Sequence, residues 1–253
     1  METIIILGKK INVMSMTGVL EKIGYWIENE SQKKHWIVLC GMHGIVEGHK
    51  SQKFKEIINS AEISLMDGMS LVFLGRLMGF SIKERIAGPD LMKECLKFSS
   101  NKGYTNFFLG GADHTLEKLL DATSSNLPKL KVVGVYSPPF REFTVEDDKK
   151  IIEAINQKKP NILWVAFDLK KQEEWIYRHR KEIESPVVIG VGAAFKFISG
   201  EVKRVPKWIG NMGLEWLWRL FHEPKKIWRR VFIYGPIFLW LAIVDLSRFN
   251  NKK

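Results

Sequence analysis

The sequence contains few cysteines and no hydrophobic run long enough to span a membrane. Its two cysteines, Cys40 and Cys95, stand in unrelated contexts among 253 residues. This excludes a disulfide scaffold, a zinc knuckle and a CxxC redox pair, and it suits a reducing cytosol. A secretory signal would place basic residues before its apolar stretch, whereas Met1-Glu2-Thr3 precedes the first apolar residues, so we expect no export signal.

Familiar catalytic and metal-binding motifs are also missing. The six histidines form no HxH or HExxH arrangement, and there is no GxSxG elbow or Walker loop. These absences argue against a metal site, a serine hydrolase of that type and a P-loop nucleotide-binding protein.

Acidic residues are outnumbered, and the excess of basic residues is uneven. The chain has 39 Lys and Arg against 28 Asp and Glu, a net charge of +11. Residues 203–253 alone hold 11 basic and 3 acidic residues, and five of the nine tryptophans. A basic, Trp-rich segment indicates an anionic partner, either nucleic acid or an acidic membrane surface.

Short apolar runs alternate with amphipathic stretches of helical length, and 45% of the residues are hydrophobic. This pattern predicts an α/β protein with a Rossmann-like, mostly parallel sheet flanked by helices. We expect residues 1–202 to form this core and residues 203–253 a basic helical appendage. The expected strands are Thr3–Leu7, Trp36–Cys40, Ile63–Met66, Thr105–Leu109, Lys131–Tyr136, Ile162–Phe167 and Val187–Val191. The expected helices are Gly18–Asn29, Ser51–Asn59, Gly88–Ser99, His114–Ser124, Thr144–Gln157, Lys170–Ile183 and Ala193–Ile198.

The appendage has the composition of a membrane-surface segment. Its uncharged run, Val231–Val244, would span about 21 Å as a helix, against about 30 Å for a hydrocarbon core. Gly235-Pro236 is expected to interrupt it, and Glu223-Pro224 to break the helical pattern before it. We therefore expect a shallow helix in the headgroup region, with a terminal helix packed on the domain as the alternative. The residues expected to face lipid phosphates are Lys225, Lys226, Arg229 and Arg230.

The junctions between strands and helices are where ligands of parallel sheets bind. Asp67-Gly68 follows one expected strand, so Asp67 could accept a proton from a substrate hydroxyl, although Asp-Gly is also a common turn. His43, in a glycine-flanked stretch after another strand, could bind substrate or shuttle protons. Gly110-Gly111 could let backbone N–H groups approach a phosphate, or could be an ordinary turn.

Three more residues near helix starts are candidates for substrate binding. Gln172 and Glu173 could hydrogen-bond a base, ribose or sugar, and a solvated helix face explains them equally well. Arg85, which precedes an expected helix beginning at Gly88-Pro89, could clamp a diphosphate or form a surface salt bridge.

Taken together, the motifs carry more information than each does alone. From about residue 35 to residue 235 they occur in the order typical of the WecG/TagA/CpsF glycosyltransferases, and the chain resembles that family. The segments that carry the resemblance are Gly41–Glu47, Asn59–Ala61, Asp67–Val72, Glu84–Met92, Phe107–Gly111, Ser137–Arg141, Gln172–Trp175, Val191–Phe195, Gly213–Leu220 and Glu223-Pro224.

The resemblance implies an inverting, metal-independent transferase with a Rossmann-like core and no cofactor. It would move a sugar, commonly of the N-acetylmannosamine type, from UDP to a polyprenyl-diphosphate-linked acceptor for a bacterial surface polysaccharide. It also implies a cytoplasmic protein, peripheral on the inner face of the membrane.

The same resemblance assigns roles to single residues. The family's general base maps onto Asp67, its arginine before the Gly-x-Asp-Leu motif onto Arg85, and its active-site glutamine onto Gln172. The appendage, which reaches the membrane and completes the site in the family, contributes the arginines that map onto Arg219, Arg229 and Arg230.

Two other kinds of function remain open from the sequence. Asp168-Leu169-Lys170 replaces the family's glycine- and proline-containing stretch, which allows a catalytically silent relative that serves as a binding or scaffold module. A nucleic-acid-binding protein would explain the charge and the tryptophans, but no recognisable motif supports it, and we expect no nucleic-acid partner.

Overall fold

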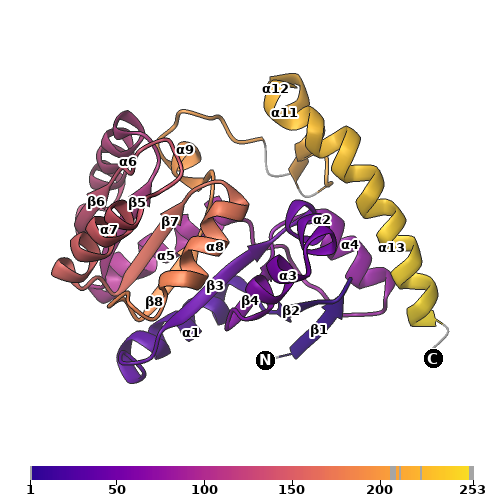
Figure 1. Ribbon diagram of the computed structural model, residues 1–253, viewed down its shortest axis with the longest axis horizontal. Coiled ribbons are helices and arrows are strands. Elements are labelled where there is room, and N and C mark those ends of the chain that lie inside the picture. The colour runs from indigo at the N-terminus through magenta and orange to yellow at the C-terminus, as the bar shows by residue number, and fades with distance from the viewer. Residues whose placement is uncertain (1, 206–208, 211, 223, 251–253) are drawn as a thin grey trace. The chain divides into compact units, whose positions relative to one another are not determined.

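The computed structural model describes residues 2–205, 209–210, 212–222 and 224–250 (Figure 1). It confirms the α/β prediction, because a six-stranded sheet in the order β4-β3-β8-β7-β5-β6 is flanked by helices. The strands are β1 (Glu2–Ile6), β2 (Lys9–Val13), β3 (His35–Cys40), β4 (Ile63–Met66), β5 (Thr105–Gly110), β6 (Lys131–Tyr136), β7 (Ile162–Ala166) and β8 (Val187–Gly190).

The helices occupy most of the remaining chain. Before the C-terminal segment they are α1 (Met16–Asn29), α2 (Met42–Lys50), α3 (Gln52–Asn59), α4 (Met69–Leu77), α5 (Gly88–Lys102), α6 (Asp113–Asn126), α7 (Val145–Lys158), α8 (Leu169–His179) and α9 (Ala194–Ile198). The C-terminal segment contains α11 (Glu215–His222), α12 (Pro224–Arg229), the π-helical turn η1 (Arg230–Tyr234) and α13 (Gly235–Asn250).

The chain folds into two compact units, each built from separated segments. Unit 1 comprises Met1–Ser15, Leu39–Ala87 and Arg204–Lys253, and unit 2 comprises Met16–Val38 and Gly88–Lys203. The division into a core of residues 1–202 and an appendage of residues 203–253 stays a prediction.

Unit 2 contains the parallel pairs of the sheet. β5 pairs with both β6 and β7, and β7 pairs with β8, each in parallel. Nearly continuous apolar strands such as β7 are buried along their length, and Trp164 at its centre is fully inaccessible. The Trp164 indole N–H donates to the buried Asn106 side chain at 2.9 Å, so these two interior polar groups are paired.

The first strand of the chain does not belong to the parallel sheet. β1 pairs antiparallel with β2, a strand that the sequence analysis missed. The turn between them places Leu7 at φ 53° and Gly8 at φ 71°, which is the backbone of a two-residue hairpin turn. The sequence Leu-Gly-Lys-Lys gives a weak signal for this turn because only its glycine favours positive φ.

Two helices of unit 1, α2 and α4, were also missed. The glycine-flanked stretch around His43 is part of a helix, because Met42–Lys50 is helical from the second residue after β3. Gly44 and Gly48 lower the helix propensity of this segment. Both are buried where α2 packs on α3, so tertiary packing overrides propensity here.

The C-terminal helix is longer than expected. Helical structure continues through Gly235-Pro236, and Ile227–Phe249 forms one helix of 23 residues. Proline is tolerated because the π-helical turn, in which the Gly235 N–H donates to the Arg230 carbonyl, replaces the regular bonding just before it. At about 34 Å the helix is long and apolar enough to cross a membrane, so the predicted shortfall is wrong.

Candidate active site

Asp67 stands at the carboxyl end of β4, as predicted, and its side chain is half-buried. Its N–H donates to the carbonyl of Cys40, the last residue of β3, at 3.0 Å. A Cβ atom built on Gly41 would lie 3.6 Å from Asp67 Oδ2, so the carboxylate sits directly against this glycine. The two strand ends therefore place a carboxylate where parallel sheets bind their ligands.

Two helices begin around this carboxylate. Gly41 is the N-cap of α2 and Gly68 the N-cap of α4, and neither supplies a side chain to cap the first amide groups. The positive ends of both helix dipoles therefore act on the Asp67 turn and stabilise negative charge there. The same amide groups can bind an anionic ligand group.

A backbone hydrogen bond joins the residues next to Arg85 and Asp67. The N–H of the next residue, Ile86, donates to the carbonyl of Met66, the residue before Asp67, at 2.9 Å. The Arg85 side chain is 13% exposed and forms an ion pair with Glu215 of α11 at 2.9 Å. The salt-bridge alternative for Arg85 is thus confirmed, with a partner in the C-terminal segment rather than on a free surface.

His43 occupies the first turn of α2 and contacts the C-terminal helix. Its Nδ1 lies 3.5 Å from Nη2 of Arg230, and its ring meets the Tyr234 ring edge-on at 4.6 Å between centroids. Since a guanidinium can only donate, Nδ1 is the acceptor in this contact. The contact therefore joins one predicted binding residue, His43, to another, Arg230.

Of the other predicted arginines of the C-terminal segment, the structure describes the side chain of Arg229. Arg229 is exposed, and its guanidinium lies 5.6 Å from the Trp228 ring centroid. Arg219 lies on α11, and its side chain is outside the described part of the structure.

In unit 2, Gln172 and Glu173 are buried rather than exposed on a helix face. Gln172 is 3% exposed, its Oε1 accepts from the Gly192 N–H at 2.9 Å, and its Nε2 donates to Glu173 at 2.7 Å. A Cβ on Gly190 would lie 2.3 Å from Gln172 Nε2, so β8 needs a glycine there. The pair ties α8 to the turn that follows β8, and the solvated-face alternative is wrong.

The glycine pair after β5 has a packing role that the sequence did not show. Gly110 has φ 109°, and a Cβ there would lie 2.4 Å from the Ala166 carbonyl oxygen. Gly111 has φ 78° with no atom closer than 3.7 Å to such a Cβ. Gly110 therefore permits the close approach of two strand ends, while Gly111 is favoured because of its positive φ alone. Phosphate binding by this turn stays a prediction.

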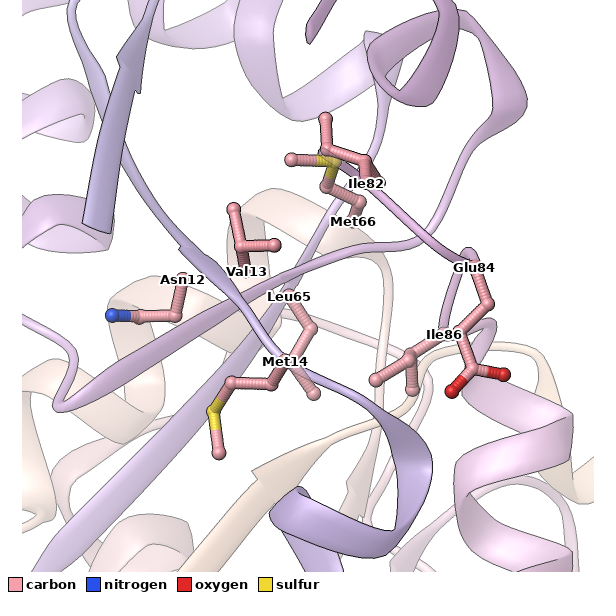
Figure 2. Close-up of a pocket in the computed structure, with 8 residues that line it drawn as sticks. All are labelled: Asn12, Val13, Met14, Leu65, Met66, Ile82, Glu84 and Ile86. Carbon is pink, nitrogen blue, oxygen red and sulfur yellow. The ribbon is translucent and has the colours of Figure 1, made fainter. Parts of the chain in front are cut away.

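Two hollows among the described residues are too small or wrongly placed for a sugar nucleotide. The first, of about 10 Å³, has room for about one water. Figure 2 shows its lining side chains, which come from β2, β4 and residues 82–86. The second, of about 240 Å³, lies beside the amino end of β6, away from the strand ends where ligands bind. Neither is lined by a predicted site residue.

Three residues at the site were missed by the sequence analysis. Glu215 pairs with Arg85, and Glu47 accepts a 2.7 Å hydrogen bond from the Tyr234 hydroxyl. Glu47 follows His43 by four residues, which would have signalled a shared helix face had α2 been expected. Nothing local signals the other contacts, which join residues more than 100 positions apart.

Comparison with known proteins now defines the class. The model of the family described as "Glycosyl transferase WecG/TagA/CpsF family" matches residues 4–252. The protein is thus a glycosyltransferase. The chain belongs to the WecG/TagA/CpsF family, which confirms the resemblance.

Relatives with a stated activity cover most of the chain. An N-acetylglucosaminyldiphosphoundecaprenol N-acetyl-beta-D-mannosaminyltransferase of Bacillus subtilis (strain 168) is 31% identical over 81% of this chain and 76% of its own length. Proteins of the same name from Bacillus spizizenii and Staphylococcus aureus (strain MW2) are 30% and 28% identical, over 80% and 93% of this chain and 76% and 90% of their own lengths.

Proposed function

We propose that this protein transfers an N-acetylmannosamine-type sugar from UDP to an N-acetylglucosamine-diphosphoundecaprenol acceptor during synthesis of a bacterial surface polysaccharide. The activity named for the relatives supports the acceptor and the transferred sugar. The observation that carries the proposal is the Asp67 carboxylate at a strand end, against Gly41 and between the starts of α2 and α4.

Asp67 acts as the general base in this mechanism. Its carboxylate takes the proton of the acceptor hydroxyl while that oxygen forms a bond to the anomeric carbon of the sugar. The bond between that carbon and the diphosphate breaks in the same step, and UDP leaves with both bonding electrons. A single displacement of this kind inverts the configuration at the anomeric carbon.

Positive groups of the chain stabilise the departing diphosphate without a metal ion in this proposal. Arg85 and Arg230 carry guanidinium groups that can bind phosphate oxygens in pairs, and Arg229 adds a third. Arg85 is held by Glu215, so the diphosphate competes with this carboxylate for the guanidinium.

We also propose that the C-terminal helix lies on the cytoplasmic face of the membrane rather than crossing it. The helix packs on other segments of unit 1. Asp245 accepts a hydrogen bond from the Leu7 N–H at 2.8 Å, and the Phe249 ring contacts the Phe80 ring. A helix docked in this way presents only its outer face to lipid. That face is apolar, since Phe232, Leu239 and Ile243 are each more than 60% exposed.

A transfer assay tests the function. Purified protein is given several UDP-sugars and a short-chain N-acetylglucosamine-diphospholipid, and products are identified by mass spectrometry. We expect a single N-acetylmannosamine-type transfer, of inverted configuration by NMR, that is insensitive to EDTA. Binding of UDP without turnover of any donor would contradict the proposal and favour a scaffold role.

Asp67→Asn is the sharpest variant. General-base catalysis contributes about 10²–10⁴-fold, so we expect the variant to fold normally and lose at least about 100-fold in kcat. Asp121→Asn, which removes an exposed carboxylate of α6, is the matched control. Wild-type turnover by Asp67→Asn would remove Asp67 from the role of base.

A further inference from the structure

The π-helical turn η1 contacts α2, as does α13, which follows it. π-Helical turns inside α-helices are rare and concentrate at functional sites. Here the turn begins at Arg230 and ends at Tyr234, and both residues contact His43. In Figure 1 the yellow C-terminal helix passes alongside α2 in this part of unit 1.

The Tyr234 side chain is held by three neighbours on one face of α2. Its hydroxyl donates to Glu47 Oε1 at 2.7 Å, its ring packs edge-on against His43, and Lys50 Nζ lies 4.3 Å from the ring centroid. Lys50 also lies 3.4 Å from Glu47 Oε1. A tyrosine fixed by a charged acceptor, a ring and a cation cannot change rotamer without losing all three contacts.

The charge states of this cluster strengthen the hydrogen bond. Burial disfavours the Glu47 carboxylate, but the hydrogen bond from Tyr234 and the charge of Lys50 outweigh it and hold the pKa of Glu47 below its usual value. The hydrogen bond to Glu47 in turn raises the pKa of Tyr234. At neutral pH a protonated tyrosine therefore donates to an ionised carboxylate, which is a stronger bond than a neutral one.

We propose that Tyr234 and Glu47 are a positioning pair that sets Arg230 beside His43 for the donor diphosphate. Arg230 is exposed, and long flexible side chains lose entropy when they are ordered. The pair fixes the backbone of the turn that carries Arg230 against the first turns of α2. This inference rests on the proposed function, because the diphosphate is the ligand that Arg230 would bind.

Tyr234→Phe tests the pair, because it keeps the ring against His43 and removes only the hydroxyl. We expect kcat to fall about tenfold, the cost of losing one hydrogen bond to a charged group, while KM for the lipid acceptor stays unchanged. Glu47→Gln, which keeps an acceptor, should retain more activity than Glu47→Ala. Tyr25→Phe, at a half-exposed tyrosine of α1, is the matched control and should match the wild type.

A double-mutant cycle separates positioning from a structural role. Because Tyr234 acts through Arg230, Tyr234→Phe should have no further effect on kcat in an Arg230→Ala background. Equal losses in both backgrounds, or wild-type kcat in Tyr234→Phe, would overturn the proposal.

Hydrogen–deuterium exchange tests whether Tyr234 positions the turn, and it needs no measurement of activity. Tyr234→Phe should speed amide exchange of residues 230–240 at least about fivefold, and Tyr25→Phe should not. If the wild type transfers no sugar, the proposed function fails, while unchanged exchange in Tyr234→Phe would overturn the positioning pair itself.

Discussion

Gly110 and Gly111 show that two identical neighbours can be required for different reasons. Both have positive φ, but only Gly110 faces a backbone carbonyl at a distance that no Cβ tolerates. A carbonyl in the adjacent strand cannot move as the end of a flexible side chain can. The two positions therefore differ in how much a methyl group costs.

We expect Gly111→Ala to lower the free energy of unfolding by about 1 kcal/mol, the strain of a positive φ in alanine. Gly110→Ala adds the clash with Ala166 and should cost about 3 kcal/mol or more. Urea unfolding followed by circular dichroism measures both. Equal losses of unfolding free energy in the two variants would show that the close approach of Gly110 to Ala166 does not add to the cost of a methyl group.

At the residue scale, the sequence located functional candidates better than it explained them. Asp67 was found because strand ends are where ligands bind, and Arg85 because it precedes a helix start; a backbone hydrogen bond joins their neighbours Met66 and Ile86. The contacts of Gln172 with Gly192, and of Tyr234 with Glu47, join distant positions and leave no local pattern. Only the folded chain shows them.

Helix α7 illustrates how local sequence can define an element completely. Thr144 and Asp147 form a reciprocal capping box, and Arg141 donates to Asp147 Oδ1 at 3.0 Å. The Arg141 hydrogen bond, with those from Thr144, lowers the pKa of Asp147. The predicted start of this helix at Thr144 was correct within one residue because the signal is local.

This lowered pKa predicts a pH dependence of stability. A depressed pKa in the folded state stabilises the protein above the ordinary value of about 4, and the contribution is lost as pH falls toward the lower folded value. The difference in Tm between the wild type and Asp147→Asn should therefore be largest above about pH 5 and shrink below about pH 4. Glu146→Gln, one residue earlier on the same helix, is the control. A difference in Tm that did not vary with pH would contradict the assignment.

At the element scale, the buried strands of the parallel sheet were predicted within one residue at either end, since apolar runs bounded by turns signal them directly. The prediction missed α2 because its glycines lower the helix propensity. It missed β2 because lysines and an asparagine obscure the alternation of apolar and polar residues. The predicted helix break at Gly235-Pro236 was wrong because a π-helical turn directly before the proline accommodates it within the helix. For α2 and β2, packing and strand pairing with other segments decided against local propensity.

For the whole molecule, the outward face of the C-terminal helix is the surface with the greatest consequence. Phe232, Leu239 and Ile243 are separated by four and seven residues, so they share one face of the helix. The opposite face contributes Phe238, Leu241 and Ala242 to the core of unit 1. An apolar face on both sides of a docked helix fits an interfacial environment rather than water.

The double variant Leu239→Gln, Ile243→Gln should weaken binding to anionic liposomes at least about tenfold, because two buried apolar side chains contribute several kcal/mol. Flotation with phosphatidylglycerol vesicles measures it. The control is Phe140→Gln, Val145→Gln, which alters two apolar residues of unit 2 that are even more exposed. Similar losses in both variants would argue against the helix as the membrane contact.

The hydrogen bond from the Leu7 N–H to Asp245 joins residues that are 238 positions apart in the sequence. Unit 1 combines Met1–Ser15 with Arg204–Lys253, so its packing cannot be completed until both segments have been synthesised. Contacts of such long sequence separation form late. Because Gly88–Lys203 of unit 2 lies in the sequence between Leu39–Ala87 and Arg204–Lys253 of unit 1, we expect unit 2 to complete its packing before unit 1 does.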